Sequence, residues 1–271
     1  MLIGAPVVFL AVFFGYPVVK ILSLSFTVDD ALSLGNYRWF FDNPVNLEVM
    51  RRTFTTATIV TAVCLVVAYP YAYLMTVVGS RWRGVLLILV LIPFWTSLMT
   101  RNFAWLVLLR DVGPVDSIAQ RLGFEAPDLL GNVKGVVLAM AQILLPFMLL
   151  PLYATLRTID RSLMSAAASL GARPSVAFVR VYLPQSLPGV MAGSLLVFVL
   201  SLGFFLTPAI IGSPQDSLLS QLIVIQVEDL LAWGHAGAMA MILLALTALL
   251  VGLAAFLGRR NPAFAAPRGR R

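Results

Sequence analysis

The stretch KGVVLAMAQILLPFMLLPLYATL, residues 134–156, carries one charged side chain at its start and is otherwise almost entirely apolar. Crossing the hydrocarbon core of a bilayer as a helix takes about 20 mostly apolar residues. A strand of a membrane β-barrel would alternate polar and apolar residues, and runs such as Val85–Leu91 show no such alternation. The stretch therefore predicts a transmembrane α-helix.

The rest of the chain has the same character. Of its 271 residues, 60% are hydrophobic and 11% are charged, and the mean hydropathy is +0.94. Because a soluble domain carries about 25% charged residues, we exclude the soluble enzyme classes and predict an all-α membrane protein. Six transmembrane helices are expected at about 2–25, 54–78, 84–109, 134–156, 187–210 and 237–258, in a single transmembrane domain over 1–271.

An alternative interpretation of the first predicted span is a cleaved signal peptide. It lacks a basic leading region and a clean small-residue cleavage site, and it is longer than a usual signal-peptide core. We therefore expect a retained helix. Because it begins almost at Met1, a cytoplasmic arm could be missing from this sequence.

The charges are distributed unevenly between the loops. Segments 79–83, 157–186 and 259–271 hold 11 of the 19 basic residues and one acid, Asp160. The positive-inside rule places these segments and both termini in the cytoplasm, with the loops 26–53 and 110–133 outside. The net charge of +7 is thus a signal of topology, and we expect no nucleic-acid partner. With Cys64 as the one cysteine and His235 as the one histidine, we expect neither a disulfide nor a metal site.

The third span is predicted to be irregular. Pro93 removes one helical hydrogen bond and favours a kink, and Arg101 follows within the apolar context. We expect the spanning helix to end near Thr100 and residues 102–109 to continue at the outer surface. Arg101 is then either an interfacial anchor whose head reaches the water or a polar group facing a translocation route.

The sequence of the cytoplasmic segment 157–186 predicts two short helices. Asp160 is placed to cap the first helix, Gly171 to end it, and Pro174 to begin the second helix, which Pro184 would end. Residues 165–169 are all Ala or Ser, so another surface can approach their backbone closely. An ordinary amphipathic interfacial helix would show the same periodicity.

A resemblance to a known family separates these alternatives. Ser165-Ala-Ala-Ala-Ser-Leu-Gly171, followed after nine residues by Val181-Tyr-Leu-Pro184, resembles the EAA loop of binding-protein-dependent ABC importer permeases. Ser165 stands where that family usually has Glu, and Val181 where it has Ile. The resemblance implies that this loop is the coupling helix seated in a cleft of an ATPase. The implied coupling residues are Ser165, Ala166, Ala167, Leu170, Gly171, Val181, Leu183 and Pro184.

Further motifs are similar to the spermidine/putrescine-type permeases, and to the first of their two permease subunits. They are Leu34-Gly-Asn-Tyr37, Ala68-Tyr-Pro-Tyr-Ala-Tyr73, Pro93-Phe-Trp-Thr-Ser97 and Gly203-Phe-Phe-Leu-Thr-Pro-Ala209. The resemblance implies a MetI-like fold in a bacterial inner membrane. It also implies a second homologous permease, two cytoplasmic ATPase subunits, and an extracytoplasmic binding protein that delivers the solute.

The sequence contains no element that would supply energy or catalysis. Neither Lys20 nor Lys134 belongs to a Gly-x4-Gly-Lys-[Ser/Thr] loop, and no catalytic carboxylate pair or Ser/His/Asp set lies within the spans. We therefore expect a transport subunit and no enzyme, with ATP and Mg²⁺ bound by the partner ATPase. The alternative class is a stand-alone six-helix channel or secondary carrier.

The solute is expected to be a polyamine, selected mainly by the external binding protein, because no acid lies within a span. A polycation would then meet aromatic faces and hydroxyl groups along the route. The residues predicted to line this path are Trp95, Thr96, Ser97, Arg101, Trp105, Phe204, Phe205 and Thr207.

Overall fold

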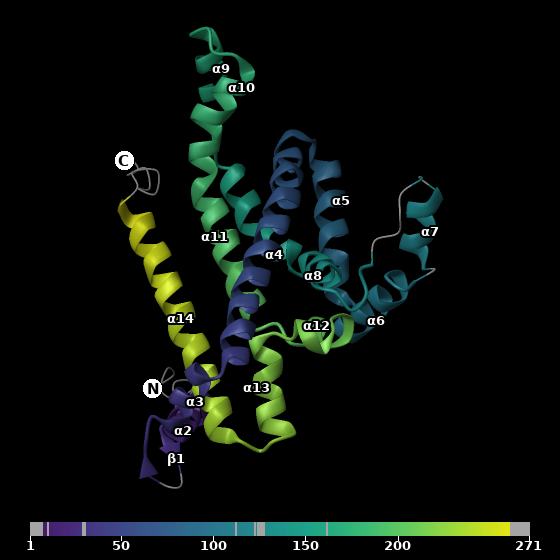
Figure 1. The fold of residues 1–271 in the computed structure, drawn as a ribbon. Coiled ribbons are helices and arrows are strands. Elements are labelled where there is room, and N and C mark those ends of the chain that lie inside the picture. Colours follow the sequence, from purple (N-terminus) through teal and green to yellow (C-terminus); the bar gives the residue numbers. More distant parts are fainter. Residues whose placement is uncertain are drawn as a thin grey trace. The chain divides into compact units, whose positions relative to one another are not determined.

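The computed structural model describes residues 8–260, apart from 10, 29–30, 112, 122, 124–127 and 161. Apart from one short hairpin, the described elements are helices, as Figure 1 shows. In chain order they are η1 (Ala11–Gly15), α2 (Tyr16–Ser25), β1 (Thr27–Val28), β2 (Ala31–Leu32), α3 (Gly35–Asp42), α4 (Pro44–Val77), α5 (Ser80–Leu91), η2 (Ile92–Trp95), α6 (Leu98–Leu108), α7 (Pro114–Arg121), α8 (Val133–Leu156), α9 (Ser162–Ser169), α10 (Pro174–Ala177), η3 (Phe178–Tyr182), α11 (Leu183–Leu202), α12 (Leu206–Ile211), η4 (Pro214–Asp216), α13 (Leu219–Glu228) and α14 (Trp233–Arg260).

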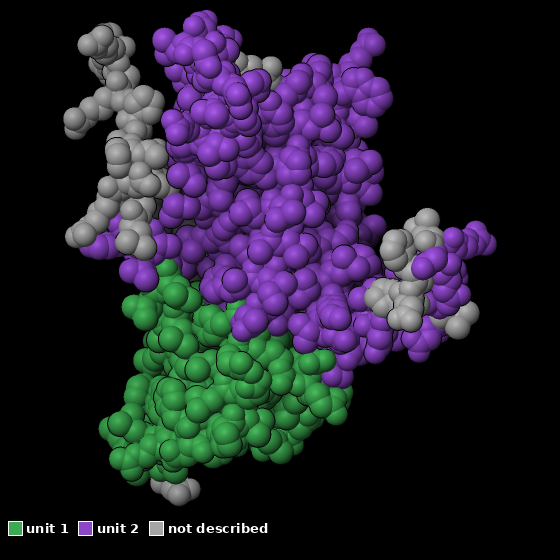
Figure 2. All heavy atoms as spheres, turned by 45° about the horizontal axis from the view of Figure 1, so that its top comes forward, with its two compact units in different colours: residues 1–54, 214–250 green, residues 55–213, 251–271 purple. Residues whose placement is uncertain are grey.

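The chain divides into two compact units (Figure 2). Unit 1 comprises residues 1–54 and 214–250, and unit 2 comprises 55–213 and 251–271. Helices α4 and α14 therefore each contribute residues to both units. The candidate coupling and path residues all belong to unit 2.

Helix α8 forms the centre of unit 2. It is apolar all round, which is typical of a helix enclosed by other helices, and α11 packs along it. Two glycines of α11 allow this approach, since a Cβ on Gly193 would lie 2.9 Å from the Met148 carbonyl oxygen and one on Gly189 would lie 2.7 Å from Thr155 Cβ. Small residues at such contacts are typical of membrane helix pairs.

The apolar helices support the predicted membrane fold. Among the described residues, α4, α8, the run Pro174–Leu202 and α14 are each long and apolar enough to cross a membrane. The helical run Ser80–Trp95 and α6 add a fifth candidate span if they are counted together. The predicted first span, 2–25, lies partly outside the described residues; its described part, Ala11–Ser25, is a shorter apolar helix.

The break in the third span lies earlier than predicted. The run Ser80–Trp95 and α6 are bent by 99°, and the bend falls at Thr96 and Ser97 instead of near Thr100. Pro93 sits in the 3₁₀ turn η2, and the chain is extended at Thr96, with ψ 143°. A proline cannot donate to the helical ladder, and the chain leaves the helix within one turn of it.

Two segments predicted as loops contain helices. Helix α4 begins at Pro44, well before the predicted start at 54, because Asn43 caps it: the Asn43 Oδ1 accepts a hydrogen bond of 2.9 Å from the Val45 N–H. An extended Asn followed by Pro is a helix-start signal that the apolar pattern obscured. Helix α7 likewise occupies part of 110–133.

Unit 1 is built around a small apolar cluster from α3, α4, α13 and α14. Its buried members are Phe40, Val49, Leu219, Met239 and Ile242. The end of α2 is held by Asn36, whose side-chain amide donates to the carbonyls of Ser25 (3.1 Å) and Thr27 (3.0 Å).

Candidate functional site

Helix α9 is closed at both ends by local interactions. At its start, the Asp160 carboxylate accepts a 2.9 Å hydrogen bond from the Ser162 N–H, which holds the pKa of Asp160 below its usual value. At its end, Gly171 has φ +82°, a left-handed conformation that favours glycine. The N–H groups of Ala172 and Gly171 donate to the Ala167 and Ala168 carbonyls at 3.0 and 2.9 Å, the paired bonds of a Schellman motif. The predicted cap and stop are confirmed.

The face of α9 around the predicted coupling residues is open to the surroundings. Ser165 and Ala166 are exposed, Ala167 is half-buried, and the Leu170 side chain is 89% exposed. Figure 1 shows α9 and α10 together beyond the start of α11. Exposed apolar residues continue along this segment at Leu163, Leu170, Val176 and Val179. A group of this kind is typical of a surface that meets another protein or a membrane.

The second helix of the segment differs from the prediction. Pro184 does not end it; Pro184 lies in the first turn of α11, and the chain stays helical from Pro174 to Leu202. The π-helical turn η3 makes this possible, since the Leu183 N–H donates to the Phe178 carbonyl, five residues back. The wider turn relieves the clash that a proline ring makes with the preceding turn of an α-helix. Val181, Leu183 and Pro184 are thus half-buried parts of a continuous rod.

An aromatic cluster joins this rod to α4. Tyr73 meets Phe178 and Tyr182 edge-on, with ring centroids 6.0 and 5.4 Å apart, and Phe178 stacks on Tyr182. Nearby, the hydroxyls of Tyr69 and Ser186 are 3.0 Å apart. Edge-on and offset rings are favourable arrangements that fix side chains in place. The sequence motifs include Tyr73 and Tyr182 but not Phe178, and the contacts among the three were not predicted, because Tyr73 lies about a hundred residues from the other two.

The predicted path residues fall on two neighbouring short helices and the break between α5 and α6. Helices α6 and α12 pack against each other, which brings together the elements that carry Arg101, Trp105 and Thr207. Trp105 donates through Nε1 to the Gln142 oxygen at 3.3 Å, and Thr207 is fully buried. Phe204 is half-buried just before α12, beside the partly exposed Phe205.

The remaining three path residues, Trp95, Thr96 and Ser97, lie at the break itself and are exposed. Residue Asn102, which sequence reasoning did not include, is fully buried in α6 and donates to the Leu98 carbonyl at 2.9 Å. The lining role of the whole set stays a prediction.

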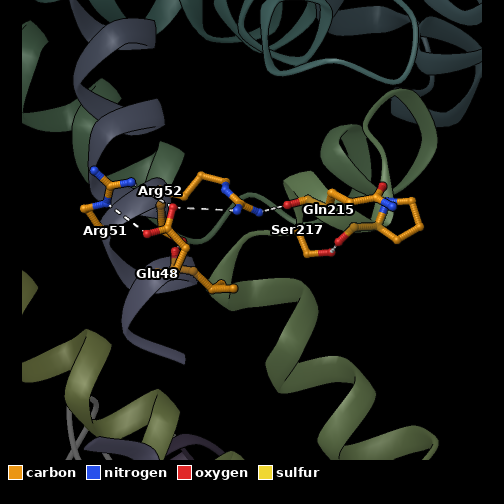
Figure 3. A network of polar contacts seen from close by, with 8 residues as sticks. Glu48, Arg51, Arg52, Gln215 and Ser217 are labelled. Atoms are coloured by element: carbon orange, nitrogen blue, oxygen red, sulfur yellow. Dashed lines mark hydrogen bonds and ion pairs between the residues drawn. The ribbon is translucent and has the colours of Figure 1, made fainter. Parts of the chain in front are cut away.

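A polar network in unit 1 holds the start of α13 (Figure 3). The Arg52 guanidinium extends from α4 to the Gln215 carbonyl and lies 3.8 Å from the Glu48 carboxylate. Next to it, the buried Thr53 hydroxyl accepts a 2.9 Å hydrogen bond from the Leu219 N–H, the first of α13. A residue of α4 thus caps a helix more than a hundred residues away. Over the described ranges, no group of His, Cys, Asp and Glu is placed to hold a metal ion.

Comparison with known proteins relates this arrangement to transport. Residues 1–261 match the family described as "Binding-protein-dependent transport system inner membrane component". The chain is 32% identical over 246 residues to the spermidine/putrescine transport system permease protein PotB of Haemophilus influenzae, covering 87% of this chain and 85% of the relative. It is 34% identical over 235 residues to the inner membrane ABC transporter permease protein YdcU of Escherichia coli, covering 79% and 75%.

Solved structures share the fold at low sequence identity. A bacterial ABC transporter involved in the import of the acidic polysaccharide alginate matches with a TM-score of 0.72 at 15% identity, covering 96% of this chain and 94% of that chain. A structure of a bacterial alginate ABC transporter in complex with a periplasmic protein bound to an alginate pentasaccharide matches with a TM-score of 0.71. These likenesses confirm the predicted class of fold.

Proposed function

This chain belongs to the binding-protein-dependent transport system inner membrane components, and from that premise we propose that it forms part of the route for a polyamine. It is a multi-pass permease subunit of an ABC importer. The relatives named for spermidine and putrescine support the polyamine, at 32% identity over most of both chains. The stand-alone channel or carrier is not favoured, because the family works with a binding protein.

The observation that carries the mechanism is the exposed, closed helix α9. Its small residues and the 89% exposed Leu170 present an apolar surface outside the apolar spans. We assign this surface to a cytoplasmic ATPase, with one ATPase subunit meeting this chain and a second meeting a homologous permease. ATP and Mg²⁺ then bind to the ATPase subunits, and this chain carries no hydrolytic chemistry.

Movement of the ATPase reaches the spans through the rod and the aromatic cluster. Residues from Pro174 to Leu202 form one helical run, so a displacement at α9 acts on a stiff lever instead of a loop. The contacts of Tyr73 with Phe178 and Tyr182 connect that lever to α4. The packed pair α6 and α12 is the proposed moving part of the path, where the solute meets Trp95, Trp105 and Phe205.

The test combines orientation, contact and transport. In a background where the buried Cys64 is replaced by Ala, Ala166→Cys is expected to cross-link to the ATPase and to resist membrane-impermeant reagents in intact cells. The matched control is Leu231→Cys, an exposed position in the segment between the predicted spans 187–210 and 237–258, which the same orientation places outside. It is expected to react with the impermeant reagents and to form no cross-link to the ATPase.

Transport is measured separately with the reconstituted importer and loaded binding protein. We expect uptake of labelled spermidine that depends on ATP. Labelling of Ala166→Cys from outside, or absence of its cross-link in an active importer, would overturn the coupling role. If the ATPase responds to another loaded binding protein but the importer takes up neither spermidine nor putrescine, the assignment of a polyamine as the solute is wrong.

A further inference from the structure

A cavity lies in unit 2, at the ends of three apolar helices. Its volume is about 460 Å³, and it lies where α4 and α8 end and α5 begins. Its lining residues are Thr76, Val77, Val78, Arg83, Tyr153, Leu156, Arg157 and Ile159. None of them belongs to the coupling or path residues discussed above.

Two arginines make the cavity suited to an anion. Arg83 donates through Nε to the Met75 carbonyl at 3.2 Å and through Nη2 to the Val78 carbonyl at 3.4 Å. These bonds orient the guanidinium and leave its Nη1 donors without a partner among the described residues. Arg157, at the end of α8, has no ion-pair or side-chain hydrogen-bond partner within the same described part of the chain. Paired guanidinium groups are the preferred protein ligands for phosphate.

The surroundings of the cavity favour a lipid as the source of that phosphate. Helix ends that border a membrane lie at the level of the lipid headgroups. Next to Arg83, the Trp82 side chain is 67% exposed, as is typical of tryptophan at a membrane–water interface. Within the cavity lining itself, Val77 at the end of α4 is 54% exposed, which gives the first part of an acyl chain an apolar contact beside the arginines.

We propose that this cavity binds the phosphate of an anionic phospholipid headgroup between Arg83 and Arg157. A free phosphate ion or phosphorylated metabolite has the same anionic chemistry but would make no use of the exposed apolar side chain of Val77 in the lining. The assignment to the inner leaflet rests on the orientation proposed above; the binding itself does not. Basic pockets between membrane helices are known to take anionic headgroups.

The bound lipid would also brace the helix ends that carry α9. Arg157 lies five residues before the start of α9 at Ser162, and Arg83 holds the last turn of α4. A headgroup that bridges the two would tie the α8–α9 connection to the end of α4. We therefore expect anionic lipid to support coupling between ATP hydrolysis and uptake as well as to be retained.

The experiment measures lipid retention by the complete importer purified from nanodiscs with equal parts phosphatidylglycerol and phosphatidylcholine. Native mass spectrometry gives the ratio of the two lipids that stay bound. Each arginine contributes about a fivefold preference for anionic lipid, so Arg157→Gln is expected to lower the ratio about fivefold. The matched control is Arg81→Gln, which removes an exposed charge from the same basic loop but does not line the cavity.

Because Arg83 also caps α4, its test variant is Arg83→Lys. Lysine keeps the positive charge but lacks the planar guanidinium that binds a phosphate through two N–H groups, so this variant should also lower the ratio of retained phosphatidylglycerol to phosphatidylcholine. An unchanged ratio in Arg157→Gln, or an equal loss in Arg81→Gln, would overturn the proposal. If inorganic phosphate at near-physiological concentration displaces phosphatidylglycerol from the wild-type importer, the cavity is a site for soluble phosphate and the proposed lipid binding is wrong. Spermidine uptake is measured in parallel. An importer that takes up spermidine but shows no arginine-dependent retention of anionic lipid contradicts the lipid site and leaves the proposed function standing.

Discussion

At the scale of single residues, Gly171 determines how α9 ends. Its φ of +82° is a conformation that costs other residues about 1–2 kcal/mol, while a Cβ there would meet no atom within 4 Å. The constraint therefore comes from the backbone and not from crowding within the chain. The proposed coupling role depends on this closed end.

The first prediction concerns substitutions at Gly171. Gly171→Val is expected to open the Schellman end and to abolish most of the stimulation of ATPase activity by loaded binding protein. Gly171→Asn should retain most of it, since Asn tolerates left-handed backbone. ATPase assays on the reconstituted importer check this, and equal stimulation in both variants would contradict it.

The second prediction concerns the pH dependence of the Asp160 cap. The Ser162 N–H lowers the pKa of this carboxyl, so the cap contributes stability above the ordinary Asp pKa of about 3.9 and loses it as the pH falls through the lowered value. Amide protection at the start of α9, measured by hydrogen exchange and corrected for intrinsic rates, should fall in that acidic range. Asp160→Asn, which keeps an oxygen acceptor, should remove the pH dependence; persistence of the transition in this variant would assign it to another group.

At the scale of elements, the contact between α8 and α11 depends on glycine. A Cβ on Gly193 would lie 2.8 Å from the Met148 sulfur and 2.9 Å from its carbonyl oxygen. The sulfur can move aside, but the carbonyl is held in α8. The close approach therefore tolerates no larger residue without separating the two helices.

The third prediction follows from this contact. Gly193→Ala should lower the stability of the purified permease by about 1–3 kcal/mol, the usual cost of overpacking a core, and so lower its Tm in detergent. Gly84→Ala is the matched control, because Gly84 lies in helix α5 with no atom within 4 Å of its Cβ position, and a helix gains from alanine there. Equal Tm values for the two variants would show that the helices can separate at little cost.

At the scale of the whole molecule, residues far apart in the sequence hold each unit together. In unit 1 the buried Thr53 of α4 supplies the cap of α13, and Arg52 holds the preceding turn through Gln215 (Figure 3). A helix end without such a partner leaves unpaired N–H groups. The position of α13 is thus determined by α4 and not by its own sequence alone.

The fourth prediction tests this long-range cap. Thr53→Val keeps the shape of the side chain but leaves the buried Leu219 N–H unpaired, at a cost of about 1–3 kcal/mol. Hydrogen exchange in the first turn of α13 should accelerate accordingly, while Thr53→Ser, which keeps the hydroxyl, should behave nearly as wild type. Unchanged exchange in Thr53→Val would mean that Gln221, which bonds the Leu218 N–H at 2.8 Å, caps the helix by itself.

The sequence by itself determined the membrane class, the apolar helices, the family resemblance and the two ends of α9. These features depend on local composition and spacing, so Asp160 and Gly171 carry their signals within a few residues. The position of the bend between α5 and α6, the helical continuation through Pro184 and the early start of α4 were missed. Each depends on a local hydrogen bond or backbone turn that hydropathy does not encode.

Only the tertiary structure decided the contacts between distant segments. Tyr73 meets Phe178 and Tyr182, Thr53 meets Leu219, and Arg83 and Arg157 line one cavity. No periodicity relates these pairs, because each contact arises from the way whole helices pack, and packing joins residues according to shape and hydrogen-bonding need irrespective of their separation along the chain.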